Sequence, residues 1–275
     1  IDPGRFYALE VPLPPIQEQK AIAAVLSEIE ASVETEVERL RVARELKQAA
    51  LAEVFSRGLR GEKQRETSLG LLPVSWQLKA LKSVAEFKSG GTPHKGTPSF
   101  WSGKIPWATP KDMKRPRLAD AIDHITEVGL ESGSSLVPAH TLLVVIRGMI
   151  LARDVPIALT EVPMAFNQDM KAILPRHGLH AEYALYAFDA NKQRLFQSVG
   201  TSAHGTRTLG SSTLEEFVVP VPDTAEQKEI AELFRNIDAK IAHHEARHRL
   251  LRELFASSLR DLMTGRRRVT GGMRC

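Results

Sequence analysis

The segment HEARH at 244–248 has a residue spacing that could do chemistry, since it matches the zinc motif H-E-x-x-H. Two histidines one helical turn apart can bind zinc, and the glutamate between them can activate a water molecule. Both histidines also fall on a heptad-spaced seam, where a partner helix should cover them. Arg247 would put a cation beside the metal, and no histidine follows His248 as a third ligand. We therefore expect no metal site here, and a metalloprotease is kept as an alternative that stoichiometric zinc would reveal.

Two stretches rich in Gly, Thr and other turn-forming residues, 88–117 and 200–212, carry the other chemically useful side chains. From 79 to 117 nine Lys or Arg stand against two acids, a local charge of +7 in a chain of net charge +4. The backbone N–H groups, hydroxyls and cations of such stretches can contact phosphates. The simpler interpretation of the local charge is a basic face that is only solvated. If the partner is DNA, the candidate contacts are Lys88, Thr92, His94, Lys95, Lys111, Lys114, Arg115, Arg117, Arg147, His204, Thr206 and Arg207.

These candidates are expected to play different roles. The four cations of 111–117 suit phosphate contacts, and the three polar residues of 204–207 suit base edges because they lie in an irregular loop. Arg147, at the end of a strand, either faces DNA or pairs with an acid such as Asp169. The glycines at 90–91 are expected to make a turn that lets the backbone come close to a neighbour.

A repeat must position these loops. VPLPPIQEQKAI and VPVPDTAEQKEI open two related stretches, 11–60 and 219–268, which are identical at 17 of 50 positions. Each opens with an apolar-proline pattern and continues as a helix, which Asp223 or Thr224 can cap in the second copy. Seam positions then recur in steps of four and three from 22 to 54 and from 230 to 262, and this spacing predicts a coiled coil. We expect the two helices to pair, within a chain or between chains, as a rod of about 55 Å.

The passage between the copies has the mixed pattern of a compact α/β domain. Strands are expected at 141–148 and 170–175, a helix at 181–199, a structural turn at 167–168 and a loop over 88–117. The fold class is therefore α+β, with one globular α/β domain flanked by two long helices that form an antiparallel coiled coil. Chemistry is not expected of this domain, because it has no Walker motif, nucleophile elbow or carboxylate cluster with metal-site spacing.

The totals of the chain are those of a water-soluble protein. It is 43% hydrophobic and 25% charged, its longest apolar run is five residues, and its single cysteine is Cys275. No disulfide can therefore form within the fold, which suits a reducing cytoplasm, and no membrane span or signal peptide is expected.

Three stretches together resemble the specificity (S) subunit of type I restriction-modification systems. They are the twin segments that open the repeat, SGGTPHKGTPSFWSGKIPWATPKDM at 89–113, and AFNQDMKAILP at 165–175. The resemblance covers nearly the whole chain. It implies target-recognition domains that each read half of a split site in double-stranded DNA, and conserved helical regions that pair antiparallel and set the gap between the halves.

The resemblance also implies partners. Modification subunits would supply methylation from S-adenosylmethionine and a restriction subunit would supply ATP- and Mg-dependent translocation and cleavage, so this subunit would bind no cofactor and catalyse nothing. The base of each helix is expected to help dock the modification subunits. The residues expected there are Pro14, Glu18, Gln19, Lys20, Pro222, Glu226, Gln227 and Lys228.

The chain departs from the family pattern because it has two helical regions and one recognition domain. We expect the end of a preceding recognition domain at 1–10, helical regions at 11–61 and 219–268, the recognition domain at 62–218, and a tail at 269–275. The chain is then a fragment of a longer subunit, or a single-domain form that makes a homodimer through its helices. The alternative function is a DNA-binding or structural coiled-coil scaffold unrelated to methylation.

Overall fold

The structure, a computed structural model, describes residues 13–202 and 205–269, which fall into two compact units. We call residues 1–47 with 236–275 the helical unit, and residues 48–235 the recognition unit. Two long helices, α2 (Ile16–Arg57) and α7 (Thr224–Met263), each run through both units. None of the helices described is both long enough and apolar enough to cross a membrane.

The predicted seam accounts for the burial along both helices. Every seam position from 22 to 54 on α2 and from 230 to 262 on α7 is buried or half-buried, and most of the remaining positions are exposed. Helices of 42 and 40 residues are about 60 Å long, which is slightly longer than expected. The first turn of α7 is capped as predicted, since the Glu226 N–H donates to Asp223 Oδ1 over 2.9 Å.

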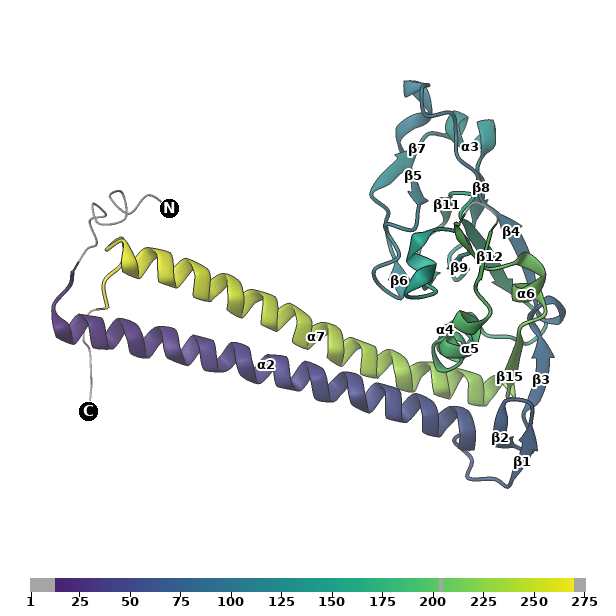
Figure 1. The fold of residues 1–275 in the computed structure, drawn as a ribbon, viewed down its shortest axis with the longest axis horizontal. Helices are drawn as coiled ribbons and strands as arrows, with labels where there is room; N and C mark the ends of the chain where they lie inside the picture. Colours follow the sequence, from purple (N-terminus) through teal and green to yellow (C-terminus); the bar gives the residue numbers. More distant parts are fainter. Residues whose placement is uncertain (1–12, 203–204, 270–275) are drawn as a thin grey trace. The chain divides into compact units, whose positions relative to one another are not determined.

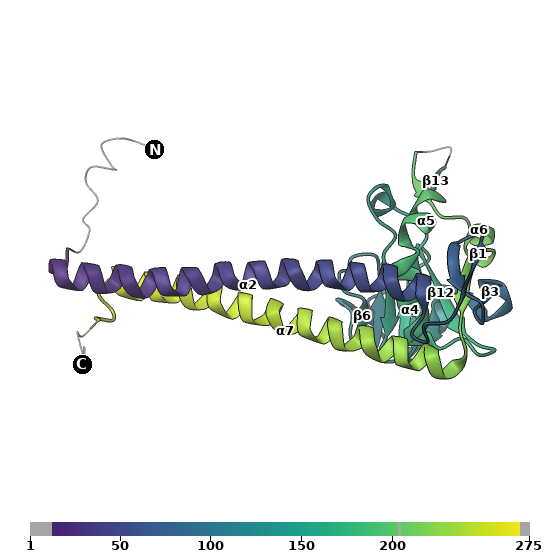
Figure 2. The same ribbon diagram turned by 90° about the horizontal axis from the view of Figure 1, so that it is seen from below.

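The contacts inside the helical unit show that α2 and α7 run antiparallel. Glu18 near the start of α2 binds Arg268 after the end of α7, whereas Lys47 binds Asp238 over 2.9 Å. Partner numbers on α7 therefore fall as those on α2 rise, and the two helices lie side by side in both views (Figures 1 and 2). The predicted fold class, with two long helices packed together, is confirmed.

A buried carboxylate, Glu36, lies on the seam of the helical unit with a relative exposure of 1%. Its oxygens accept from His244 Nδ1 at 2.8 Å and Arg39 Nη1 at 2.8 Å, and Arg247 Nε lies 3.2 Å away. The hydrogen bond from His244, followed by those charges, lowers the pKa of Glu36 despite its burial. Because the repeat offset is 208, Glu36 and His244 are equivalent positions of the two copies, as are Arg39 and Arg247.

The recognition unit is built on two sheets. The five-stranded sheet has the order β4-β12-β9-β10-β6 and the four-stranded sheet the order β7-β5-β11-β8 (Figure 1). The first comprises β4 (Ala85–Ser89), β12 (Met170–Pro175), β9 (Leu142–Val145), β10 (Ile157–Thr160) and β6 (Arg117–Leu118), and the second comprises β7 (Asp123–Ile125), β5 (Trp101–Ala108), β11 (Met164–Phe166) and β8 (Ser135–Val137).

Smaller elements complete the unit. Three two-stranded pairs join β1 (Gln64–Thr67) to β2 (Gly70–Pro73), β3 (Gln77–Ala80) to β15 (Val218–Val221), and β13 (Gly200–Thr201) to β14 (Arg207–Thr208). The helices are α3 (Glu127–Gly133), α4 (Ala181–Ala190), α5 (Lys192–Gln197) and α6 (Ser211–Glu215), with 3-10 turns η1 (Leu81–Ser83), η2 (Pro98–Phe100) and η3 (Met149–Ala152).

An aromatic cluster holds the recognition-unit ends of both long helices to α4. The Phe55 ring stacks on Tyr183 with centroids 5.6 Å apart and meets Trp76 edge-on at 6.1 Å, while Phe234 lies 5.2 Å from Tyr186. Complete burial raises the pKa of Tyr183, whose hydroxyl donates to the Pro220 carbonyl over 2.7 Å. These rings account for much of the apolar burial that fixes the helix ends.

Two local predictions are wrong. The 88–117 stretch is not a loop throughout, because it contains the strand β5, whose Trp107 is buried in the core of the four-stranded sheet. The helix expected over 181–199 breaks at Asn191, whose side chain donates to the Ala187 carbonyl and competes with continuation of the helix.

Candidate nucleic-acid interface

The ends of three neighbouring strands bring several predicted contacts together. Strand β12 pairs antiparallel with both β4 and β9, and Lys171 faces Ser89 on one side and Val144 on the other. The end of β4, the start of β12 and the end of β9 therefore meet at one edge of the five-stranded sheet. Lys88 is exposed at that edge, and Arg147 follows two residues after β9.

The glycine pair after β4 packs against the end of β11, as predicted for a close backbone approach. A Cβ on Gly90 would lie 2.2 Å from the Asn167 carbonyl oxygen, and the Gly91 N–H donates to the Phe166 carbonyl over 2.9 Å. The next residue, Thr92, donates its hydroxyl hydrogen to Gln168 Oε1. Any side chain larger than hydrogen at residue 90 would force these two segments apart.

The AFNQDM segment forms the expected structural turn. Asn167 is buried, and its Oδ1 accepts from the Asp169 N–H over 3.2 Å, which is the geometry of an Asx turn. Its own N–H donates to the Ala108 carbonyl over 3.0 Å, so the turn also joins β11 to the end of β5. Gln168 remains exposed at the same place.

Arg147 and Arg207 are brought together from distant parts of the sequence. Arg147 forms an antiparallel bridge with Thr208, and the Gly148 N–H donates to the Arg207 carbonyl over 3.1 Å. Both arginine side chains are exposed, and neither has an ion pair within the described residues. The backbone N–H of Arg147 donates to the Asp169 carbonyl over 3.2 Å, and no ion pair joins the two side chains within the described residues.

The segment after β5 presents three further free cations. Lys111, Lys114 and Arg115 are exposed and form no ion pair within the part of the chain that is described. The neighbouring acid, Asp112, is engaged by backbone instead, since it accepts from the Thr109 N–H at 2.8 Å and the Ile122 N–H at 2.8 Å. Asp112 therefore forms no ion pair with these three cations within the described residues.

Two tryptophans hold the turn that carries His94 and Lys95. Trp101 Nε1 donates to the His94 carbonyl over 3.3 Å, and Trp107 Nε1 donates to the Gly91 carbonyl over 3.0 Å. The two indole rings meet edge-on with centroids 5.1 Å apart. His94 and Lys95 are exposed on this clamped turn, and their role as DNA contacts stays a prediction.

Arg117 is placed differently from the other predicted contacts. Its side chain is mostly buried, with Nη1 lying 3.4 Å from Glu182 Oε1 and 3.8 Å from Glu161 Oε1. Burial acts to lower the pKa of Arg117, but contacts with Tyr186 and Glu182 outweigh it and raise the pKa. These contacts argue against a phosphate role. Thr206 is half-buried beside Arg207, and His204 lies outside the described residues.

The Glu-Gln pair of the second repeat copy is an internal anchor. Glu226 is 1% exposed and Gln227 is 0% exposed. Glu226 accepts from Leu59 N–H over 2.7 Å and from Trp76 Nε1 over 3.1 Å. Gln227 accepts from the His180 N–H and donates to the Gly178 carbonyl, each over 2.7 Å.

The second-copy partner-binding prediction is therefore wrong for Pro222, Glu226 and Gln227, because all three are buried within the recognition unit. Lys228 is exposed and stays a prediction. Pro222 supplies the carbonyl that Gln227 Nε2 binds over 2.9 Å.

The first copy repeats this geometry with less burial. Gln19 Nε2 donates to the Pro14 carbonyl over 2.8 Å, which matches the bond from Gln227 to Pro222. Pro14, Glu18 and Gln19 are only half-buried, and Lys20 is exposed. Their role in partner binding stays a prediction.

Three HEARH side chains, those of His244, Glu245 and Arg247, have partners within the helical unit. His244 binds Glu36, and Glu245 Oε1 accepts from Arg44 over 2.6 Å. No group of three or more His, Cys, Asp or Glu within residues 13–202 and 205–269 is arranged to hold a metal ion. His244 lies on the heptad seam, and this position explains its contact with Glu36 of the facing helix.

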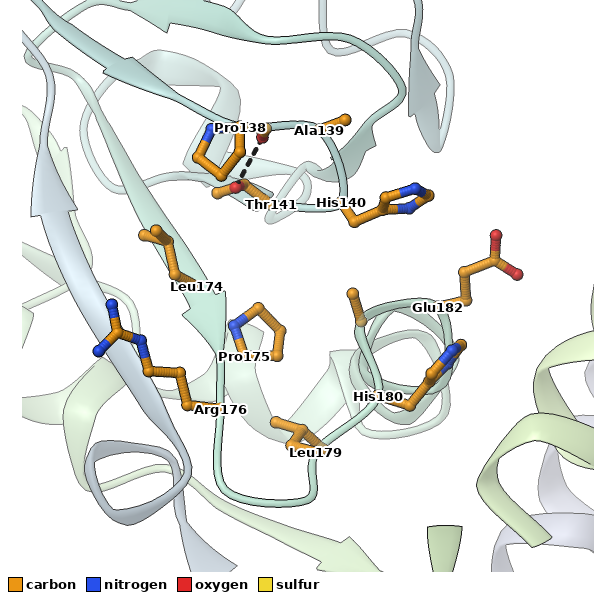
Figure 3. A pocket seen from close by; sticks show the side chains of 11 residues that line it. Pro138, Ala139, His140, Thr141, Leu174, Pro175, Arg176, Leu179, His180 and Glu182 are labelled. Carbon is orange, nitrogen blue, oxygen red and sulfur yellow. Dashed lines mark hydrogen bonds between the residues drawn. The ribbon is translucent and has the colours of Figure 1, made fainter. Parts of the chain in front are cut away.

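One pocket of the recognition unit lies between the β8–β9 connection, the end of β12 and the start of α4 (Figure 3). His140, His180 and Glu182 line it, and burial lowers the pKa of His180, partly opposed by the charge of Glu182. None of the predicted DNA contacts lines this pocket, so we do not assign the nucleic-acid interface to it.

Sequence reasoning missed some exposed residues near the predicted contacts. Lys104 on β5 and Arg153 after η3 are exposed cations without an ion pair in the described ranges. Lys104 was visible in the local charge count, whereas Arg153 stands alone in an apolar-looking stretch. We call the following set, whose members lie on or after β4, β5, β9, β11 and β14, the recognition edge: Lys88, Thr92, Lys111, Lys114, Arg115, Arg147, Gln168 and Arg207.

A family model defines the class of protein. The model of the type I restriction modification DNA specificity domain matches residues 73–252, which is more than half of the chain. The chain therefore belongs to the type I restriction-modification specificity family.

Two curated relatives sharpen this assignment. The chain is 34% identical over 167 residues to the type I restriction enzyme EcoR124I/EcoR124II specificity subunit of Escherichia coli, over 60% of this chain and 41% of the relative. It is 28% identical over 194 residues to the MjaIX specificity subunit of Methanocaldococcus jannaschii, over 69% of this chain and 44% of the relative. The chain thus spans less than half the length of either relative.

Solved structures share the fold. The type I S subunit from M. genitalium matches with a TM-score of 0.63 at 17% identity, over 96% of this chain and 65% of that one. The HsdS subunit from Thermoanaerobacter tengcongensis matches with a TM-score of 0.56 at 19% identity, over 93% and 60%. At these identities the likeness concerns the fold alone.

Proposed function

We propose that this chain reads double-stranded DNA for a type I restriction-modification enzyme, and that it does so through the recognition edge. The observation that carries the proposal is a group of six exposed cations in this edge. None of them has a carboxylate partner among the described residues: Lys88, Lys111, Lys114, Arg115, Arg147 and Arg207. Cations left unpaired on strand ends suit a polyanion, because phosphates neutralise them and release counterions.

The edge also offers groups that can distinguish bases. Arg207 and Gln168 carry the donor and acceptor geometry that reads guanine and adenine in the major groove. The backbone around them is fixed by the Asx turn and by the bridge between Arg147 and Thr208. Rigid presentation of such side chains favours sequence-dependent contacts over nonspecific ones.

The remaining parts of the proposal concern partners. Modification subunits would transfer the methyl group of S-adenosylmethionine to adenine and release S-adenosylhomocysteine. A restriction subunit would use ATP and Mg to translocate and cleave, while this chain directs both without chemistry of its own. A second recognition domain would come from a longer subunit or from a homodimer through the helices, in the cytoplasm. The two relatives named above support this assembly, because both are specificity subunits of type I restriction enzymes.

The test is selection of duplexes from a random 25-base-pair pool by the full chain at low salt. We expect enrichment of a short sequence, and about tenfold weaker binding to it by Arg207→Ala, since a bidentate base contact contributes about 1–3 kcal/mol. Leu71→Ala is the matched control, because Leu71 is exposed on the β1–β2 hairpin and is not one of the predicted contacts. A pool left unchanged by folded wild-type protein would refute the proposal.

A further inference from the structure

The turn that follows Arg147 exposes apolar side chains among cations. Met149 is 71% exposed and Ile150 41% exposed, both on the 3-10 turn η3. Leu151, in the same turn, is 1% exposed and packs into the recognition unit. An exposed Met beside an exposed Ile needs a reason, because each leaves apolar surface in water that core packing would otherwise remove.

This turn is held in place by its neighbours. The Gly148 N–H donates to the Arg207 carbonyl, the Arg147 N–H donates to the Asp169 carbonyl, and the Leu151 N–H closes the turn on Gly148. Gly148 has a φ of 131°, which glycine adopts readily and other residues rarely do. The apolar tip is therefore presented by a fixed backbone with a buried Leu anchor, and it is not the end of a loose loop.

The turn has three exposed cations as neighbours, two in sequence and one through its backbone. Arg147, Arg153 and Arg207 are exposed and make no ion pair with a described residue. The acid at the end of the turn, Asp154, is already paired with Lys192 over 2.9 Å. The apolar tip lies between Arg147 and Arg153 in sequence, and Gly148 joins its backbone to Arg207. This arrangement is complementary to a ligand with phosphates outside and an apolar stack inside.

We propose that Met149, supported by Ile150, is a wedge that inserts at a base step of the bound duplex. Apolar side chains in such wedges unstack a step and kink the DNA, while nearby arginines hold the flanking phosphates. Pyrimidine–purine steps unstack most easily, so the wedge adds specificity at a position where no hydrogen bond reads the base. This inference rests on the proposed DNA-reading function and adds a residue that determines specificity.

The test uses the duplex that the wild-type chain enriches from the random pool, with 2-aminopurine placed in turn at each purine position. Unstacking raises the fluorescence of this base, so wild-type protein should give a severalfold increase at one step. Met149→Ala should abolish that increase and weaken binding about tenfold. Its salt dependence should match wild type, because the arginines remain. Leu71→Ala, which truncates another exposed apolar side chain, should retain both signal and affinity.

The possible outcomes distinguish the proposed wedge from the proposed DNA-reading function on which it rests. Enrichment of a duplex without a fluorescence increase at any position would overturn the wedge and leave DNA reading intact, as would an increase that persists in Met149→Ala. Unchanged DNA behaviour in Met149→Ala, together with lost co-purification of the modification subunit, would show that the tip binds protein and would also overturn the wedge. Failure of wild-type protein to enrich any duplex would remove the proposed function and the wedge together.

Discussion

The helical unit and the recognition edge use their cations in opposite ways. On the helices, Arg41 bridges Glu38 and Glu45, Arg44 binds Glu245, and three cations surround the buried Glu36 when His244 is protonated. At the recognition edge, the acid nearest in sequence to Lys111 and Lys114 is occupied by backbone N–H groups. Cations on the helices are therefore engaged by carboxylates, within one helix or between the two, whereas cations on the edge remain available for a ligand.

The comparison predicts separate consequences for the two regions. Removing a charge whose partners are buried should cost stability, because the partners lose their hydrogen bonds without gaining water. Removing an exposed unpaired cation should leave folding unchanged and weaken an anionic complex. A substitution that lowered both the stability of the fold and the affinity for an anionic ligand would contradict this division between the two regions.

The largest effect on stability is expected at the anchor of α7. Glu226→Ala leaves the Leu59 N–H and the Trp76 indole N–H without an acceptor, and should lower the free energy of unfolding by about 3 kcal/mol. Glu18→Ala is the matched control, because Glu18 holds the equivalent position in the first copy and is only half-buried. Urea unfolding of the full chain measures both, and similar losses in the two variants would refute the anchor role.

A smaller effect is expected at the centre of the helix pair. Glu36→His would place two imidazoles and two guanidinium groups together on the seam, and should lower the Tm by about 5 °C. The double exchange Glu36→His with His244→Glu restores one carboxylate and one imidazole at equivalent positions, and should recover most of the loss. Thermal unfolding followed by circular dichroism tests this. A double variant as unstable as the single one would show that the contact does not determine pairing.

The sequence allowed the helical frame to be predicted because its signal is periodic. Seam positions chosen by their spacing alone are all buried or half-buried, including Glu36 and His244. The strand β5 was missed because Gly103 and Pro106 give it the composition of a loop, while its burial comes from pairing with β7 and β11. Periodicity reports local geometry, whereas sheet pairing depends on residues far away in the chain.

The same limit applies to the candidate site. Exposed lysines near Gly and Pro could be found from composition, but Glu226 and Gln227 were expected at a surface because polar residues in a first helical turn usually lie there. Their burial depends on Trp76, Leu59 and Gly178, which no local pattern connects to them. Met149 could not be distinguished from the apolar strand before it until the turn at Gly148 was placed.

The most direct measurement compares the salt dependence of DNA binding in two triple variants. Lys111→Ala/Lys114→Ala/Arg115→Ala removes free cations of the edge, and Arg41→Ala/Arg44→Ala/Arg57→Ala removes exposed arginines that are paired with carboxylates on the helices. If the three edge cations contact phosphates, the slope of log K against log salt should become shallower by about 2.7, since each contact contributes about 0.9. The helix variant should keep the wild-type slope. Equal slopes in the two variants would contradict the assignment of DNA binding to the recognition edge.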